Sequence, residues 1–382
     1  MEYLIVFFYL LIGFFVFDLL KIRFSKSRVW IIFGYVLFVS LAGFRFRIGF
    51  DTINYMRYFE EMDSLIGLSN QSFEIQRFQP LWVILVAISK SISREFYMLQ
   101  LVVALFFNYC VFKFLSDNKV LGFFSMALYF STYYFYFNFE ILRESISVGI
   151  FLLSLNYYLT RSWWKYYLLI TISFFFHSSA FVLFLFPIFN YVNRKFLIIF
   201  LICFITWIIF DFSVFFDFLV SVFMFESSFS YYDIYLQSLS NLNIKGVILD
   251  VFKVVLVPLF LYAMNVHSGE RMQRLRPFLL LSFVVGVLSL FIPIFVRINS
   301  YFYIIYLMFI SDYFYHKFFV RKNNLYFNLS LFLVLFGFYW NLLTVSLDRN
   351  DKQSSHKLIR RYLPYSHVFN PQTDQIRESY AY

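Results

Sequence analysis

The sequence predicts an all-α, polytopic integral membrane protein with roughly 10–12 transmembrane helices. First, 61% of the residues are hydrophobic and only 14% are charged, whereas about 25% are charged in a typical soluble domain. Second, apolar runs recur along the chain, and several approach the ~20 residues needed to cross a bilayer. No segment between them is long enough to bury a core of its own, so we expect residues 1–382 to form a single membrane domain.

The apolar runs define the expected helices. They cover residues 3–21, 29–44, 96–115, 120–137, 141–160, 166–188, 247–265, 277–295, 299–318 and 325–346. Two further regions are ambiguous. Residues 80–93 are short for a span and contain Lys90, which favours a helix on the membrane surface. Residues 196–225 form a longer apolar run that crosses the membrane either once or twice.

Basic residues in short loops orient the chain, because such loops stay on the cytoplasmic side. The loops that are cytoplasmic by this rule are 21–28, 271–276 and 317–322. The N-terminus, a long loop over residues 45–79, the neighbourhood of Arg297 and a tail over residues 347–382 then lie on the outer side.

The side on which Arg143 lies depends on residues 80–93. If this segment crosses the membrane, Arg143 is cytoplasmic and residues 196–225 cross once. If it lies on the surface, Arg143 joins residues 45–79 outside and residues 196–225 cross twice. We favour the second arrangement, because so short a run with an internal lysine makes a poor span. Apolar residues at helical spacing also predict a surface helix over residues 53–66.

A charged stretch within residues 43–55 is the first candidate site. It holds Arg45, Arg47, Asp51 and Tyr55 directly after an apolar run. The simpler interpretation is a basic membrane anchor with one balancing carboxylate. The order Arg-x-Arg-x-x-x-Asp-x-x-x-Tyr, with a glycine two positions before the carboxylate, leads us to favour a functional site.

Further polar residues interrupt or edge the apolar runs. Glu140 and Arg143 are three positions apart, so they either form a pair within one helix or leave the arginine to bind an anion. His177 is either a neutral histidine bonded inside the core or a functional base or sugar ligand. Arg297 and Tyr301 repeat the arrangement of an arginine before a tyrosine, which is also typical of an interface anchor.

Arginines on one face of a membrane protein suggest a clamp for phosphate or diphosphate, because guanidinium groups bind such oxygens in pairs. The four candidates are Arg45, Arg47, Arg143 and Arg297. The proton of an attacking sugar hydroxyl would pass to Asp51, Glu140 or His177, and the residues do not decide among them. The expected reaction is glycosyl transfer with a lipid diphosphate as the leaving group.

Composition argues against several other partners. The net charge of +10 comes from lysines and arginines in short loops, which indicates contact with membrane lipid and no nucleic acid. The outer loops contain no Asp-x-Asp pair, so we expect no metal and no cofactor. Cys110 and Cys203 both lie in apolar runs, and neither a disulfide nor a metal site is expected.

Motifs in order along the chain resemble the EpsG/Wzy family of bacterial exopolysaccharide and O-antigen polymerases. They are residues 45–55, Leu142 to Ser147, Phe176 to Ala180, Arg297 with Tyr301, and Leu363 to Tyr365. The resemblance implies a GT-C-like membrane fold, with an outer loop carrying amphipathic helices. It also implies a periplasmic enzyme that polymerises undecaprenyl-diphosphate-linked oligosaccharides, a step of lipopolysaccharide or exopolysaccharide synthesis. A chain-length regulator protein is a candidate partner.

By motif position, the resemblance carries over a set of site residues. They are Arg45, Asp51, Tyr55, Arg143, His177 and Arg297. We add Glu140 as a catalytic candidate, and Arg47, Tyr301 and Tyr365 as substrate-binding candidates. One departure is Gln79, where the family often has an acid. If that acid is catalytic in relatives, its role falls here to Glu74 or Asp51.

Other functions stay open at this stage. A flippase or transporter for lipid-linked oligosaccharides would line a central cavity with charge and show related halves, and this chain shows neither pattern. Another lipid-linked glycosyltransferase would use much the same residues. An O-acyltransferase would need an acid beside its histidine, and the sequence places none close to His177.

Overall fold

The computed structural model describes residues 2–20, 24–49, 51–68, 79–118, 120, 122–190, 251–263, 270–291, 294–317, 324–344 and 362–373. All regular structure within these ranges is helical, and η labels mark π or 3-10 segments. In chain order the helices are α1 (Glu2–Gly13), η1 (Phe14–Leu19), α2 (Phe24–Gly43), α3 (Thr52–Glu61), α5 (Pro80–Ile92), α6 (Tyr97–Asp117), α7 (Phe123–Thr132), η2 (Tyr136–Glu140), α8 (Leu142–Leu159), α9 (Trp163–Phe176), η3 (Ser178–Asn190), η5 (Phe252–Leu256), α14 (Val257–Ala263), α15 (Glu270–Leu275), α16 (Pro277–Phe291), α17 (Ile294–Tyr315) and α18 (Asn324–Thr344).

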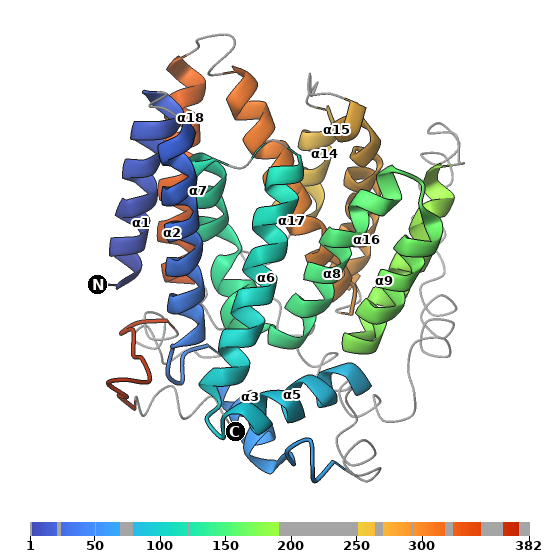
Figure 1. Cartoon of the computed structure of the whole chain (residues 1–382). Helices are drawn as coiled ribbons and strands as arrows, with labels where there is room; N and C mark the ends of the chain where they lie inside the picture. The colour runs from blue at the N-terminus through green and yellow to red at the C-terminus, as the bar shows by residue number, and fades with distance from the viewer. Residues whose placement is uncertain are drawn as a thin grey trace.

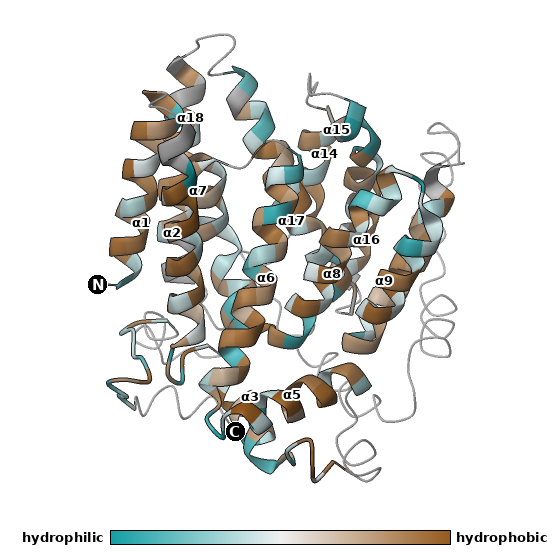
Figure 2. Cartoon of the chain, viewed as in Figure 1, coloured by the Kyte–Doolittle hydropathy of each residue, from teal (hydrophilic) through white to brown (hydrophobic). Residues whose placement is uncertain are grey.

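The long helices stand side by side as a bundle, and α3 and α5 lie across its lower end (Figure 1). Apolar residues cover most of the bundle, whereas polar residues gather at its ends, on α15 and around α3 (Figure 2). By length and composition, three helices of the described part can cross a membrane: Glu2–Leu19, Tyr97–Asp117 and Glu270–Leu290. Shorter apolar helices accompany them. The expected all-helical fold of a polytopic membrane protein is confirmed.

Two predicted helices are broken in the structure. The run 120–137 divides into α7 and η2, and the run 166–188 divides into α9 and η3. The second break is at His177, whose backbone is extended with φ −153° and ψ 124°. Apolar composition could not reveal this break, because the run is apolar on both sides of His177. In the structure, the side chain of His177 contacts the hydroxyl of Ser179. The run 196–225 lies outside the described residues, so its number of crossings and the total number of spans stay predictions.

The predicted basic loop over residues 271–276 and the predicted site lie at opposite ends of the bundle. Arg271 of α15 donates to Asn118 at the end of α6, and Arg274 donates to the carbonyl of Leu159 at the end of α8. Arg143 lies in the first turn of α8, at the other end of this helix, about 24 Å from Leu159 at 1.5 Å per residue. We call the end covered by α3 and α5 the α3–α5 end. Which end faces the cytoplasm stays a prediction from charge.

The segment that was ambiguous in the sequence, residues 80–93, forms α5 and runs crosswise to the bundle (Figure 1). The ammonium group of Lys90 donates to the carbonyls of Phe59 and Glu60 at 2.8 Å and also to that of Met62. These carbonyls end α3, where a helix leaves acceptors unpaired. Lys90 therefore joins the two surface helices, which agrees with the preferred interpretation of this segment.

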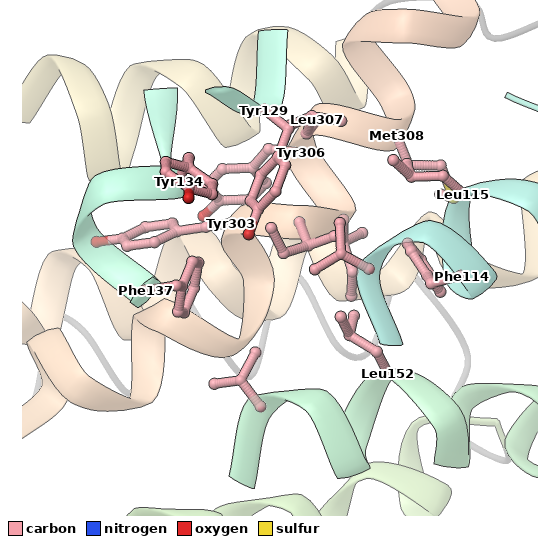
Figure 3. Packing of buried hydrophobic residues seen from close by; sticks show 14 of the residues in the cluster. Phe114, Leu115, Tyr129, Tyr134, Phe137, Leu152, Tyr303, Tyr306, Leu307 and Met308 are labelled. Carbon is pink, nitrogen blue, oxygen red and sulfur yellow. The ribbon is translucent and has the colours of Figure 1, made fainter. Parts of the chain in front are cut away.

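The core is packed largely by aromatic side chains. Figure 3 shows Tyr303 and Tyr306 of α17 among other buried residues of neighbouring helices. Three buried polar side chains of the core form a closed ring of hydrogen bonds. The amide of Asn108 donates to Asn138, the amide of Asn138 donates to Tyr129, and the hydroxyl of Tyr129 donates back to Asn108. Such closed networks satisfy polar groups that apolar surroundings would otherwise penalise.

The end of the described chain packs back on the loop that follows α2. The backbone N–H of Phe46 donates to the carbonyl of Ser366 at 2.9 Å, and the hydroxyl of Tyr365 donates to the carbonyl of Leu41 at 3.0 Å. Residues 362–373 thus lie on the same side of the bundle as the charged stretch.

Candidate functional site

The start of α8, the end of α9 and the start of α17 meet at the α3–α5 end of the bundle. Ile141 adopts φ −115° and ψ 54° and separates η2 from α8. Arg143 and Glu144 therefore occupy the first turn of α8. The extended residue His177 ends α9, and Arg297 lies in the first turn of α17. Glu140 and Arg143 belong to different helical segments, so the expected geometry of an intrahelical pair does not apply.

The centre of the site is a buried carboxylate and imidazole. Glu144 is 3% exposed and His177 is 4% exposed. Oε2 of Glu144 lies 3.9 Å from Nε2 of His177, and Oε1 accepts a hydrogen bond from the hydroxyl of Ser300. Nη1 of Arg297 lies 3.4 Å from the same imidazole nitrogen. A carboxylate and a guanidinium group thus lie within 4 Å of one imidazole nitrogen at the end of an apolar bundle.

A chain of hydroxyl groups holds the other edge of the imidazole. Nδ1 of His177 lies 2.6 Å from the hydroxyl of Ser179, which lies 3.1 Å from that of Tyr301. The Tyr301 hydroxyl lies 2.7 Å from that of Ser147, which in turn lies 2.6 Å from that of Ser173. Because the hydroxyl of Ser179 can donate or accept, Nδ1 has a partner in either neutral tautomer of the histidine. The hydroxyl network comes from four different helical segments, which are α8, α9, η3 and α17.

Helix α3 brings further candidates to this centre. Burial raises the pKa of the Tyr55 phenol, while the positive charge of Arg143 lowers it and the negative charge of Asp51 raises it. Arg297 also acts on the same phenol. The ring of Tyr55 packs edge-on against Trp82 of α5, with 5.7 Å between ring centres. The structure therefore gathers Asp51, Tyr55, Arg143 and Arg297 around one point, and Arg143 lies on the same side as residues 51–61.

Arg45 lies in a different, buried environment. Its guanidinium group is 4.8 Å from the centre of the Phe139 ring and donates to the carbonyls of Ala42 and Ile48. Burial lowers the pKa of this guanidinium to about 10, so it stays charged at neutral pH. Glu140, also buried, is the carboxylate whose charge acts on it. Through its contact with the Phe139 ring, Arg45 holds the loop after α2 against η2.

The remaining candidates are placed as follows. Arg47 has a left-handed backbone with φ 53°, and its guanidinium lies 6.0 Å from the centre of the Phe46 ring. Tyr301 is fully buried inside the hydroxyl network. Tyr365 is partly buried and donates to the α2 carbonyl described above. Substrate binding by Arg45, Arg47, Tyr301 and Tyr365 stays a prediction.

Comparison with known proteins assigns the family. The sequence model of the EpsG family matches residues 28–367. The chain belongs to the EpsG family. Membership identifies a multi-pass membrane protein of polysaccharide biosynthesis. No curated protein and no solved structure matches the chain, so the GT-C-like architecture stays a prediction.

In this EpsG-family protein, sequence reasoning missed Glu144 and its partner Ser300. Glu144 directly follows Arg143, and a carboxylate next to a candidate arginine was a usable signal. Ser300 and Ser179 carry no such signal, because their roles depend on how α8, α9 and α17 meet. No acid lies close to His177 along the sequence. In space, Glu144 of another helix supplies that acid.

Proposed function

We propose that this EpsG-family protein polymerises undecaprenyl-diphosphate-linked oligosaccharide repeat units at the periplasmic face of the bacterial inner membrane. The product is an O-antigen or exopolysaccharide chain. The observation that carries the proposal is the buried pair of Glu144 and His177, flanked by Arg143 and Arg297 at the α3–α5 end. Charged groups at the membrane boundary that converge on one another are typical of functional sites.

The two arginines suit the leaving group. A diphosphate ester is multiply charged, and guanidinium groups bind its oxygens through charge-assisted hydrogen bonds. Arg143 and Arg297 lie close enough for their positive charges to repel one another, and Glu144 supplies one negative charge against these two. A bound diphosphate would relieve this repulsion and would be stabilised as the glycosidic bond breaks. This arrangement requires no metal ion.

The carboxylate suits the acceptor. In the proposed step, a sugar hydroxyl oxygen attacks the anomeric carbon of the donor, the bond from that carbon to the diphosphate oxygen breaks, and the electron pair leaves with the diphosphate. Glu144 accepts the hydroxyl proton, and His177 orients the carboxylate or passes the proton onward. We assign to Glu144 the role of base that the sequence offered to Asp51, Glu140 or His177, because Glu144 lies 3.9 Å from the imidazole of His177.

The same pair leaves a second candidate function. A histidine beside a carboxylate is the arrangement that an outer-leaflet O-acyltransferase needs, and the structure provides it. Acyl transfer would modify existing sugars and would leave the length of the polysaccharide unchanged. Gel analysis of polysaccharide length therefore distinguishes the two functions.

The test is complementation of a deletion strain, followed by gel analysis of surface polysaccharide. The variants are Glu144→Gln and Arg143→Ala, and the matched control is Lys113→Ala, which removes an exposed charge paired with Asp117. We expect single lipid-linked repeats outside the membrane and no ladder for the two site variants at normal protein levels, and a full ladder for the control. Repeats trapped on the cytoplasmic side would favour a flippase. A full ladder lacking acyl groups would favour acyl transfer.

A further inference from the structure

Lys253 is a cation within an otherwise apolar helical segment. It belongs to η5, which continues directly into α14. Phe252, Leu256 and Phe260 recur every four residues along this segment and are 58%, 50% and 62% exposed, so they form an apolar outer face. In a membrane bundle such a face meets lipid. Lys253 stands beside this face.

The ammonium group of Lys253 points at aromatic rings. It lies 4.6 Å from the centre of the Tyr303 ring and 5.9 Å from that of Tyr136. The ring of Tyr133 stacks on Tyr303 with 4.8 Å between centres. We call Tyr133, Tyr136 and Tyr303 the tyrosine cage. Figure 3 shows the Tyr303 ring projecting from α17 into the packed interior.

The depth of this cation needs an explanation. Tyr303 lies nine residues after Ile294, the start of α17, which is about 14 Å along the helix. A lysine at membrane depth is strongly disfavoured unless it faces a cavity or a partner. Within the ranges that the structure describes, its contacts are with aromatic rings and include no carboxylate. A cation–π contact recovers only part of the lost hydration.

The tyrosine cage connects Lys253 to the candidate site. Tyr136 lies within electrostatic range of both Glu144 and Arg297. Tyr133 lies within electrostatic range of Lys253. The cation therefore stands between a lipid-facing surface and the buried pair of the site.

We propose that Lys253 and the tyrosine cage bind the diphosphate group of a prenyl-linked saccharide as it reaches the site sideways from the membrane. The prenyl chain would lie along Phe252, Leu256 and Phe260. The inference rests on the proposed function and adds a third cation to Arg143 and Arg297. An ammonium group is a compact donor of three hydrogen bonds and suits a single phosphate oxygen.

Binding is tested with the purified full chain in nanodiscs of zwitterionic lipid. The probe is a fluorescent prenyl diphosphate. The variants are Lys253→Met, which keeps the length and removes the charge, and Lys253→Arg, which keeps the charge. The matched control is Lys165→Met, because Lys165 also makes a cation–π contact, at 5.5 Å from Tyr157, near the opposite end of the bundle. We expect Kd to rise about tenfold or more for Lys253→Met, and to change by less than about threefold for Lys253→Arg and the control.

Competition identifies the ligand. Prenyl diphosphate should displace the probe, whereas inorganic diphosphate and vesicles of phosphatidylglycerol should displace it weakly. Full displacement by inorganic diphosphate would assign the site to a free anion and overturn the lipid inference. Displacement by phosphatidylglycerol would do the same in favour of an ordinary phospholipid.

Failure of this inference is distinguishable from failure of the proposed function. Wild-type affinity in Lys253→Met, with binding lost in Arg297→Ala, overturns the role of Lys253 alone. Failure of the wild-type protein to bind prenyl diphosphate overturns both. Thermal unfolding of each variant checks the fold. If Lys253→Met is unfolded, Lys253→Gln replaces it with the same expected loss of affinity.

Discussion

Oε2 of Glu144 lies 3.9 Å from Nε2 of His177, although one residue begins α8 and the other ends α9. The contact exists because both helices break at this level. Ile141 stops η2 before α8, and the extended backbone of His177 stops α9 before η3. Two helix ends are thereby brought together inside an apolar bundle, where Ser300 donates to Glu144 and Ser179 bonds the imidazole of His177.

Replacing Glu144 with Gln tests the carboxylate as a base. The amide keeps the size of the side chain and can still bond Ser300, but it cannot accept a proton. A positioned general base contributes about 10²–10⁴-fold to a rate, so polymer yield should fall by at least about a hundredfold. Polymer is quantified on gels from cells with equal protein levels. Glu144→Asp, which keeps the charge, should retain part of the activity, and equal yields from both variants would contradict the assignment.

Replacing Tyr301 with Phe tests the hydroxyl network. The change removes the group that joins Ser147 to Ser179 but keeps the buried ring. Hydrogen bonds between membrane helices contribute about 0.6 kcal/mol on average and at most about 1.7 kcal/mol. Thermal unfolding of the purified protein in detergent should therefore show a small decrease in stability. Polymer yield should fall more than this decrease explains, because His177 loses its fixed orientation. An unchanged yield would make the network purely structural.

The architecture could largely be predicted from the sequence, because apolar runs and loop charges report directly on membrane spans. Even the crosswise position of α5 followed from its length and from Lys90. The boundary at Ile141 could be predicted, since Glu140 and Arg143 stand where the apolar runs 120–137 and 141–160 meet. The break at His177 could not, since it falls inside the single apolar run 166–188. Hydropathy records where a chain is buried but not where its backbone leaves the helix.

The candidate site was predicted in part. Asp51, Tyr55, Arg143, His177 and Arg297 are found together, because each interrupts or edges an apolar run at the same end of the bundle. Arg45 and Glu140 looked equivalent in the sequence, yet the structure encloses them beside Phe139. The difference lies in the fold of the loop after α2 and in the packing of the tail onto it. Neither leaves a pattern in a single sequence.

Replacing Gly49 with Ala tests how that loop docks. Gly49 has φ 108°, and a Cβ atom there would stand 2.4 Å from the carbonyl oxygen of Phe139 and 2.8 Å from the hydroxyl of Thr52. Both the backbone conformation and the space require glycine. Strain at such a position costs about 1–3 kcal/mol, before the steric clash is counted. We expect low accumulation of protein in membranes on an immunoblot. Gly67→Ala, where the nearest contact is 3.2 Å, is the milder control.

Replacing Lys90 with Met tests the link between the two surface helices. The change removes a charged donor from three carbonyls at the end of α3 while keeping the length of the side chain. Because the group is only partly buried, we expect the local stability of α3 to fall by about 1–2 kcal/mol with little effect on the bundle. Amide hydrogen exchange should speed up roughly tenfold in residues 52–61 and stay unchanged in α8. Tyr55 is carried by α3, so polymer yield should fall as well. Unchanged exchange in α3 would show that its packing against Trp82 and its neighbours holds the helix without the lysine.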